Sequence, residues 1–235
     1  MSSDGFFTSP GMTVKVSGLT KVYKTSAEEV RALKGIEWEV GPGQAVAIMG
    51  PSGCGKTTLL NLLGGVDHPS QGQIRVGDQQ ITSLSERELE KYRLLGVGFV
   101  FQFFNLIPTL TAFENLELPM LIAETAPAER KKRCEGLLQM VGLGEKMDKR
   151  PEELSGGEQQ RVAVALSLAN DPSLILADEP TGNLDTENTT AIAALFTSLA
   201  ERHGKTVIMA SHDPKAVEQF GKVYQMRDGK FIDNR

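Results

Sequence analysis

One stretch decides how this chain folds: Ala45-Val46-Ala47-Ile48-Met49-Gly50-Pro51-Ser52-Gly53-Cys54-Gly55-Lys56-Thr57-Thr58. The apolar run 45–49 predicts a strand buried on both faces, and the residues from Lys56 onward predict a helix. Between them the chain matches G-x-x-x-x-G-K-[ST] at every fixed position. The glycines let backbone N–H groups point into one concavity, and the helix start adds partial positive charge there. The stretch therefore predicts a strand, a phosphate-binding loop and a helix.

The loop and the start of the helix are candidates for binding a nucleotide. Lys56 can bridge the β- and γ-phosphates, and the Thr57 hydroxyl can ligate Mg²⁺. The alternative is a glycine-rich turn that merely joins strand to helix, which the lysine, the threonine and both flanks disfavour. We expect ATP to contact Gly50, Pro51, Ser52, Gly53, Cys54, Gly55, Lys56, Thr57 and Thr58.

A pair of carboxylates follows a second buried run, at 174–177. Adjacent acids after an apolar strand are costly unless they meet a cation or water. Asp178 suits Mg²⁺, directly or through water, and Glu179 suits the orientation and polarisation of an attacking water. The alternative is an exposed strand end with solvated acids, which the phosphate-binding loop makes less favourable.

Periodicity predicts the remaining elements. Residues 1–11 are small and polar and predict a loose tail. Strands are expected at 12–17, 36–40, 73–76 with a hairpin to 81, 97–101, 174–177 and 206–210, with a closing hairpin at 224–232. Helices are expected from 56, and at 85–92, 114–122, 127–141 and 156–169.

Composition bounds the class of protein. The 235 residues suffice for one large domain, or for one core with a smaller subdomain. The net charge of −5 argues against non-specific binding to nucleic acid, which usually needs a basic face. No apolar run approaches the roughly 18 residues that span a bilayer, and 1–10 lacks a secretory signal pattern. We therefore expect a cytosolic chain with two free cysteines, Cys54 and Cys134.

The segment Leu154-Ser155-Gly156-Gly157-Glu158-Gln159-Gln160-Arg161 resembles the signature sequence of the ABC (ATP-binding cassette) family, usually LSGGQ. Glu158 stands where glutamine is commonest. Taken alone, the segment is a capping box before an apolar helix, whose N–H groups would also bind an anion. Its position before Asp178 and Glu179 favours the signature. The resemblance extends from about Val14 to Phe231.

The resemblance implies roles for four further residues. Tyr23 would stack on adenine, Gln102 would sense Mg²⁺ and water, and His212 would contact the γ-phosphate as a catalytic residue beside Glu179, Lys56 and Gln102. Asp185 would help to join the two sites of a dimer, although Gly182 and Asn183 depart from the usual serine and alanine of this loop. The plainer alternatives are a surface tyrosine, polar strand ends and an unremarkable histidine.

The implied fold class is α/β, a P-loop NTPase with a RecA-like core, a mainly parallel sheet, an antiparallel β subdomain and a helical subdomain. Residues 1–235 would form a single ABC ATPase domain. Segments 12–101 and 171–235 would form the core with the β subdomain, and 103–170 the helical subdomain. ATP, with Mg²⁺ on Thr57, Gln102 and Asp178, would lie in a head-to-tail homodimer. The second copy would contribute Ser155, Gly156, Gly157, Glu158 and Asp185.

Several stretches are similar to the lipoprotein-release and macrolide-export (LolD/MacB-type) group: 62–67, 104–111, 114–116 and 178–185. This implies an ATPase at the cytoplasmic face of the membrane that drives export or mechanotransmission. Its partner would be an integral membrane permease, FtsX/MacB-like, on a separate chain. Phe103, Phe104, Leu106 and Phe113 would line a groove for a coupling helix of the permease, or would simply belong to the subdomain core.

Two other classes compete with a transporter subunit. A soluble ABC ATPase acting on DNA or ribosomes usually has two cassettes or a long coiled coil, and this sequence shows neither. A scaffold that binds nucleotide without hydrolysing it would not need Glu179 and His212. We therefore expect no nucleic-acid partner, and an ATPase that converts ATP and water to ADP and phosphate.

Overall fold

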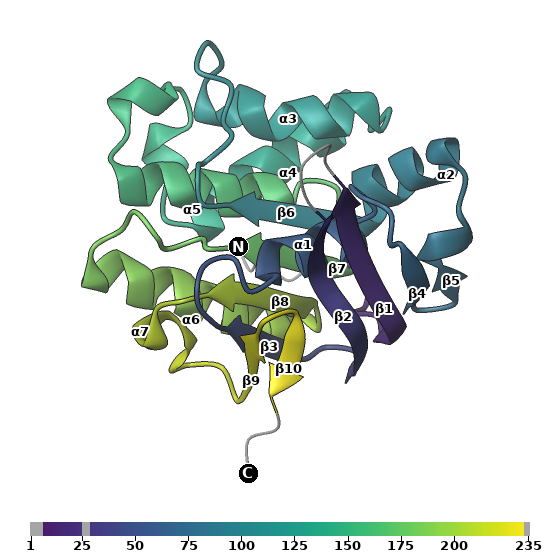
Figure 1. The fold of residues 1–235 in the computed structure, drawn as a ribbon. Coiled ribbons are helices and arrows are strands. Elements are labelled where there is room, and N and C mark those ends of the chain that lie inside the picture. Colours follow the sequence, from purple (N-terminus) through teal and green to yellow (C-terminus); the bar gives the residue numbers. More distant parts are fainter. Residues whose placement is uncertain (1–6, 25–28, 233–235) are drawn as a thin grey trace.

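The strand predicted at 45–49 lies inside a larger, mostly parallel sheet (Figure 1). A computed structural model describes residues 7–24 and 29–232. Over these residues a six-stranded sheet has the order β10-β9-β3-β8-β7-β6. β3 pairs in parallel with β8 and β9, and β7 pairs in parallel with β6 and β8, whereas β10 is antiparallel to β9. The strands are β3 Ala45–Met49, β6 Val97–Phe101, β7 Leu174–Asp178, β8 Thr206–Ser211, β9 Lys222–Arg227 and β10 Lys230–Ile232.

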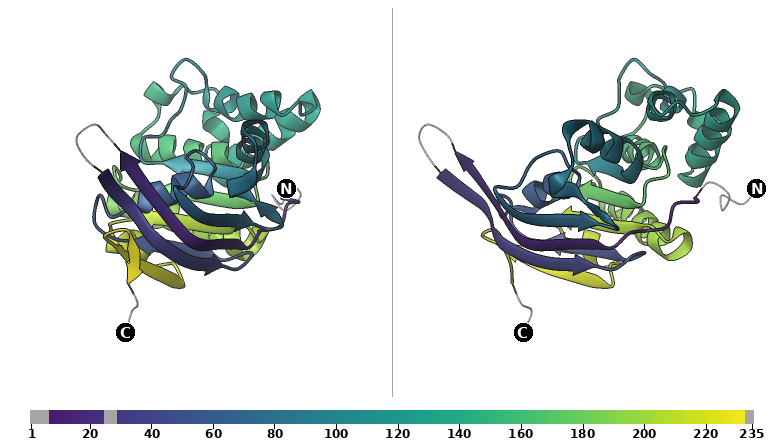
Figure 2. Two further views of the ribbon diagram at one scale, coloured as in Figure 1. Left: turned by 45° about the vertical axis from the view of Figure 1, so that its right-hand side comes forward. Right: turned by 90° about the vertical axis from the view of Figure 1, so that its right-hand side faces the viewer.

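A second, antiparallel sheet has the order β2-β1-β4-β5. In β1, Val14 and Val16 are buried while Lys15 is exposed, as the alternating pattern predicts, and a register shift between Val16 and Leu19 brings Leu19 into the core as well. Figure 2 shows this sheet as a layer beside the larger one. Its strands are β1 Val14–Lys24, β2 Glu29–Val40, β4 Gln71–Val76 and β5 Gln79–Gln80.

The five predicted helices, α1 to α5, lie close to their predicted positions, with differences at their ends, whereas α6 and α7 were not predicted. α3 begins two residues before the predicted Glu114, because a capping box between Thr111 and Glu114 starts it there. α2 ends at Lys91, and a π-helical turn, Tyr92–Gly96, leads into β6. The helices are α1 Lys56–Leu63, α2 Glu86–Lys91, α3 Ala112–Ile122, α4 Pro127–Met140, α5 Gly156–Ser167, α6 Thr186–His203 and α7 Pro214–Val217.

The larger sheet is buried on both faces, which explains its continuous apolar strands. Ala177 and Val207 pack into one cluster with α3 to α6, whereas Leu176 and Ile208 pack into another with α1 and the antiparallel sheet. Successive side chains of one strand thus point to opposite faces of the larger sheet. Among the described residues, no helix combines the length and apolar character required to cross a membrane.

The N-terminal segment departs from prediction. We expected 1–11 to be a loose tail, but residues 7–11 are held against the body of the protein, while 1–6 lie outside the described residues. The amides of Thr8 and Ser9 both donate to the Asp171 carboxylate at 2.8 Å. The prediction for 7–11 was wrong because a buried carboxylate far along the chain supplies these bonds, and local composition does not reveal such a partner.

Candidate functional site

The predicted phosphate-binding loop is held between β2 and the β9–β10 turn. Gly229 donates its N–H to the Cys54 carbonyl at 3.0 Å, and the Lys34 N–H donates to the Gly229 carbonyl at 3.0 Å. Gly55 has φ 110°, which side-chain-bearing residues rarely adopt. A Cβ at Gly50 would lie 2.2 Å from the Met226 carbonyl oxygen. The loop therefore needs glycine at both positions.

The start of α1 is suited to an anion. Its N-cap is Gly55, and within the described residues no side chain caps it and no acidic residue occupies its first turn. The first N–H groups of the helix can therefore donate to a phosphate. Lys56 is only 5% exposed, and its Nζ donates to the Gly50 and Pro51 carbonyls at 2.8 and 3.2 Å. These bonds hold the lysine across the mouth of the loop.

Three predicted catalytic side chains meet at the carboxyl edge of the larger sheet. Glu179 Oε1 lies 3.2 Å from Lys56 Nζ, and its Oε2 lies 2.9 Å from His212 Nδ1. The His212 backbone N–H also donates to Oε2, at 3.2 Å. Glu179 has φ 48°, an unusual conformation for a residue with a side chain. The end of β7 thus turns this carboxylate toward the lysine and the histidine.

Asp178, just before Glu179, fits a cation. Its Oδ1 is buried and has no hydrogen-bond partner among the described residues, although the Thr57 hydroxyl bonds to the carboxyl group. Burial raises the pKa of Asp178, the charge of Glu179 adds to the rise, and Thr57 and Lys56 oppose it. Mg²⁺ commonly uses one or two carboxylates together with substrate phosphates. The donor set therefore fits Mg²⁺. Among the described residues, no group of three or more His, Cys, Asp or Glu side chains could hold a metal ion by itself.

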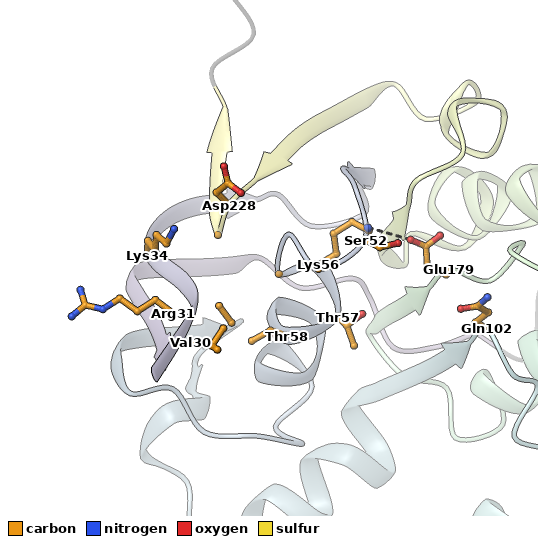
Figure 3. Close-up of a pocket in the computed structure, with 14 residues that line it drawn as sticks. Val30, Arg31, Lys34, Ser52, Lys56, Thr57, Thr58, Gln102, Glu179 and Asp228 are labelled. Carbon is orange, nitrogen blue, oxygen red and sulfur yellow. Dashed lines mark ion pairs between the residues drawn. The ribbon is translucent and has the colours of Figure 1, made fainter. Parts of the chain in front are cut away.

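A cavity of about 400 Å³ opens beside the loop (Figure 3). Gln102, at the end of β6, and Glu179 lie on one side of it, and the labelled residues of β2 lie on the other. The predicted residues in its wall are Ser52, Gly53, Gly55, Lys56, Thr57, Thr58, Gln102 and Glu179.

Sequence reasoning missed part of this wall. It includes Val30, Arg31, Ala32 and Lys34 of β2, and Asp228 and Gly229 of the β9–β10 turn. The Asp-Gly pair was visible as a hairpin turn, but its place beside the loop depends on the long-range bond from Gly229 to Cys54.

Tyr23 is close to the cavity without being part of its wall. Its hydroxyl donates to Asp67 Oδ2 at 2.9 Å and hydrogen-bonds with the Thr58 side chain, which does line the cavity. Lys21 Nζ lies 4.8 Å from the centre of the tyrosine ring. The predicted contact of Tyr23 with adenine stays a prediction.

The predicted signature residues lie away from this cavity. The Ser155 Oγ accepts the Glu158 N–H at 3.3 Å, and Glu158 Oε2 accepts the Ser155 N–H at 3.0 Å, so the capping box is present. Asp185 caps α6 by accepting the Asn188 N–H at 2.8 Å. Ser155, Gly156, Gly157, Glu158 and Asp185 do not belong to the cavity wall of the same described chain.

Comparison with known proteins identifies the family to which this chain belongs. The family model described as ABC transporter matches residues 33–182. The chain belongs to the ABC transporter family. The ATP-binding protein LolD of a lipoprotein-releasing system from Pseudomonas fluorescens is 42% identical over 214 residues, covering 91% of this chain and 94% of the relative. The macrolide export ATP-binding/permease protein MacB from Marinobacter nauticus is 43% identical over 226 residues, covering 96% of this chain but 35% of the relative.

Solved structures agree with this ABC assignment. A dimeric ATP-binding cassette in a post-hydrolysis state, bound to ADP and Pi, matches with a TM-score of 0.86 and 41% identity over 94% of this chain and 97% of that chain. The predicted family and the α/β fold class with its mixed sheet are therefore confirmed. The protein is an ATP-binding and hydrolysing subunit of the ABC type, and the alternative of a soluble ATPase acting on DNA or ribosomes is not favoured.

Proposed function

We propose that this ABC protein hydrolyses ATP in a head-to-tail homodimer and couples hydrolysis to a membrane permease on a separate chain. The observation that carries the proposal is the position of Glu179 between Lys56 and His212, with ion-pair distances of 3.2 and 2.9 Å. A carboxylate held between two nitrogen groups, beside a phosphate-binding loop, is suited to orienting a water for attack on a phosphate.

In this proposal each side chain has a role. Glu179 orients the attacking water and accepts its proton, while Lys56 and His212 donate to the γ-phosphate. Asp178, Thr57 and Gln102 hold Mg²⁺, which when bound neutralises charge on the phosphate oxygens. The fit of the metal is supported by the buried, unpartnered Asp178 Oδ1 of the described chain.

The nucleotide would occupy the cavity beside the loop. Residues 50–58 would bind its phosphates, Gln102 and His212 would contact its γ-phosphate end, and Tyr23 would stack on adenine. The second copy would close the site with Ser155, Gly156, Gly157, Glu158 and Asp185. The exposure of Ser155 and Gly156 at the start of α5 supports this arrangement, because exposed N–H groups can donate to a phosphate of another copy.

The proposal also divides the chain into a core and a helical subdomain. Segments 12–101 and 171–235 would act as the core with its β subdomain, and 103–170 as a helical subdomain that carries the signature. The permease would dock beside Gln102, where the side chain of Phe103 is 72% exposed.

A permease partner is suggested by the names of two relatives. One is an ATP-binding/permease protein, and the other is the ATP-binding protein of a lipoprotein-releasing system. We therefore propose an FtsX/MacB-like permease and a location at the cytoplasmic face of the membrane.

The first test compares ATPase turnover of the purified chain with that of Glu179→Gln, together with light scattering in ATP and Mg²⁺. Losing a positioned base should lower turnover on the order of a hundredfold or more. The variant should also accumulate as an ATP-bound dimer, because ATP remains uncleaved between the two copies.

Glu201→Gln is the matched control, because it makes the same chemical change on an exposed position of α6. It should turn over like the wild type. Equal turnover of Glu179→Gln and wild type would contradict the assigned base, and a variant that stays monomeric in ATP would contradict the head-to-tail site.

A further inference from the structure

The signature segment carries a negative charge where its helix should receive an anion. Glu158 is the third residue of α5, close to the N–H groups of Gly156 and Gly157. A carboxylate here stabilises the helix itself, because it accepts the Ser155 N–H and interacts favourably with the positive end of the helix dipole. It also cancels part of the positive potential that would attract a phosphate of a second copy. The common glutamine could cap the helix without this charge.

The structure pairs this charge with a lysine from another element. Lys146 lies in the 3-10 turn Gly144–Lys146, and its Nζ donates to Glu158 Oε1 at 2.6 Å. Glu158 therefore has both oxygens occupied, one by Lys146 and the other by the Ser155 N–H. The hydrogen bond from Lys146, followed by that from Ser155, holds the pKa of Glu158 below its usual value, so it is ionised at neutral pH.

Neighbouring charges do not replace this lysine. Lys149, three residues later, is paired with Glu153 at 2.8 Å. Arg161, one turn further along α5, donates to Asn188 Oδ1 at 3.1 Å. Lys146 is thus the cation that the structure places on the Glu158 carboxylate, whose side chain is only 18% exposed.

We propose that Lys146 is a positioning residue of the signature segment, which pairs with Glu158 so that this helix N-terminus can accept the terminal phosphate of ATP bound to a second copy. The inference rests on the proposed head-to-tail function. Lys146 is needed for dimerisation because the signature segment carries the negatively charged Glu158. When Glu158 is replaced by a neutral residue, dimerisation should no longer depend on Lys146.

The test measures the dimer Kd in saturating ATP and Mg²⁺ by light scattering, in the Glu179→Gln background. Lys146→Gln should weaken the dimer about tenfold, because an unpaired carboxylate then faces the phosphate. Glu158→Gln should tighten it, since Lys146 then adds positive charge. The Lys146→Gln/Glu158→Gln double variant should return to within about threefold of the parent, because both charges are gone. The weakening should shrink in high salt.

Two controls separate this role from a structural one. Lys149→Gln removes the same charge from the neighbouring exposed pair and should leave the Kd unchanged, and Lys146→Arg should rescue binding. Thermal unfolding of each variant checks that the helix is intact. If Lys146→Gln dimerises like the parent, or the double variant is as weak as Lys146→Gln, the inference fails while the proposed function stands. A parent that stays monomeric in ATP would overturn both.

Discussion

Gly157, which has no side chain, allows the start of α5 to lie against the start of α6. Asn188 of α6 accepts a hydrogen bond from Arg161 at 3.1 Å and donates to both Asp185 oxygens at 3.0 Å. A Cβ on Gly157 would lie 2.3 Å from Asn188 Oδ1. The signature helix and the segment that begins α6 can therefore meet only because residue 157 has no side chain.

Gly157→Ala should destabilise the protein by about 1–3 kcal/mol, because the new methyl group displaces Asn188 and its hydrogen bonds. Urea unfolding measures the loss. Gly156→Ala is the matched control, since its Cβ would meet no described atom closer than Phe104 Cζ at 3.8 Å. Equal stability of the two variants would show that the contact with Asn188 is unimportant.

The N-terminal segment is an element held by a buried charge cluster. Asp171 accepts hydrogen bonds from Thr8 and Ser9 and pairs with Lys205 Nζ at 2.5 Å, and Lys205 is fully buried. Burial alone would raise the pKa of Asp171, but the bonds from Lys205, Thr8 and Ser9 outweigh it and hold this pKa below its usual value. Segment 7–12 is thereby attached to the start of β8.

Asp171→Asn should lower the free energy of unfolding by about 3–5 kcal/mol at pH 7, because it leaves Lys205 buried and uncompensated. The folded pKa of Asp171 lies below the unfolded one. Its contribution is therefore complete above about pH 4 and is lost as the pH falls through the folded value.

Urea unfolding of both proteins at pH 7 and in acid checks this dependence. The difference between variant and wild type should shrink in acid. The Asp171→Asn/Lys205→Met double variant should recover part of the loss, and a constant difference at all pH values would rule out the charge explanation.

The folded protein exposes a large apolar side chain, that of Phe103, next to Gln102 of the candidate site. Phe103 follows Gln102 and is 72% exposed, whereas Phe104, Leu106 and Phe113 are partly buried. The predicted groove thus divides into residues that pack inward and one that faces solvent. In Figure 1 this segment follows β6 at the end of the sheet that carries the site. Phe103 is therefore the residue of this segment with which the proposed permease contact can be tested.

Phe103→Ser should reduce co-purification with the permease about tenfold or more, because aromatic anchors dominate interface energies. The free energy of unfolding of this variant should differ from that of the wild type by no more than about 0.5 kcal/mol, as is usual for a substitution on the surface. Ile232→Ser, at a 48% exposed position on β10, is the control and should retain the permease. Full retention by Phe103→Ser would remove this residue from the proposed interface.

The sequence by itself determined the elements and side chains whose signals are local. The buried strand, glycine loop and helix at 45–58 follow from neighbouring residues, as does the capping box at Ser155. Asp178 and Glu179 were located by the strand before them. Such features depend on periodicity, backbone freedom and hydrogen bonds within a few residues, so the order of the residues is enough to predict them.

Only the tertiary structure decided which distant residues meet. The cavity wall from β2 and Asp228, the Asp171–Lys205 pair and the Lys146–Glu158 pair join segments that no local pattern connects. The tail prediction failed for 7–11 for the same reason, because its partner lies more than 160 positions away. Long-range contacts form when the packed sheets and helices bring their ends together, and that packing depends on the whole core rather than on any one stretch.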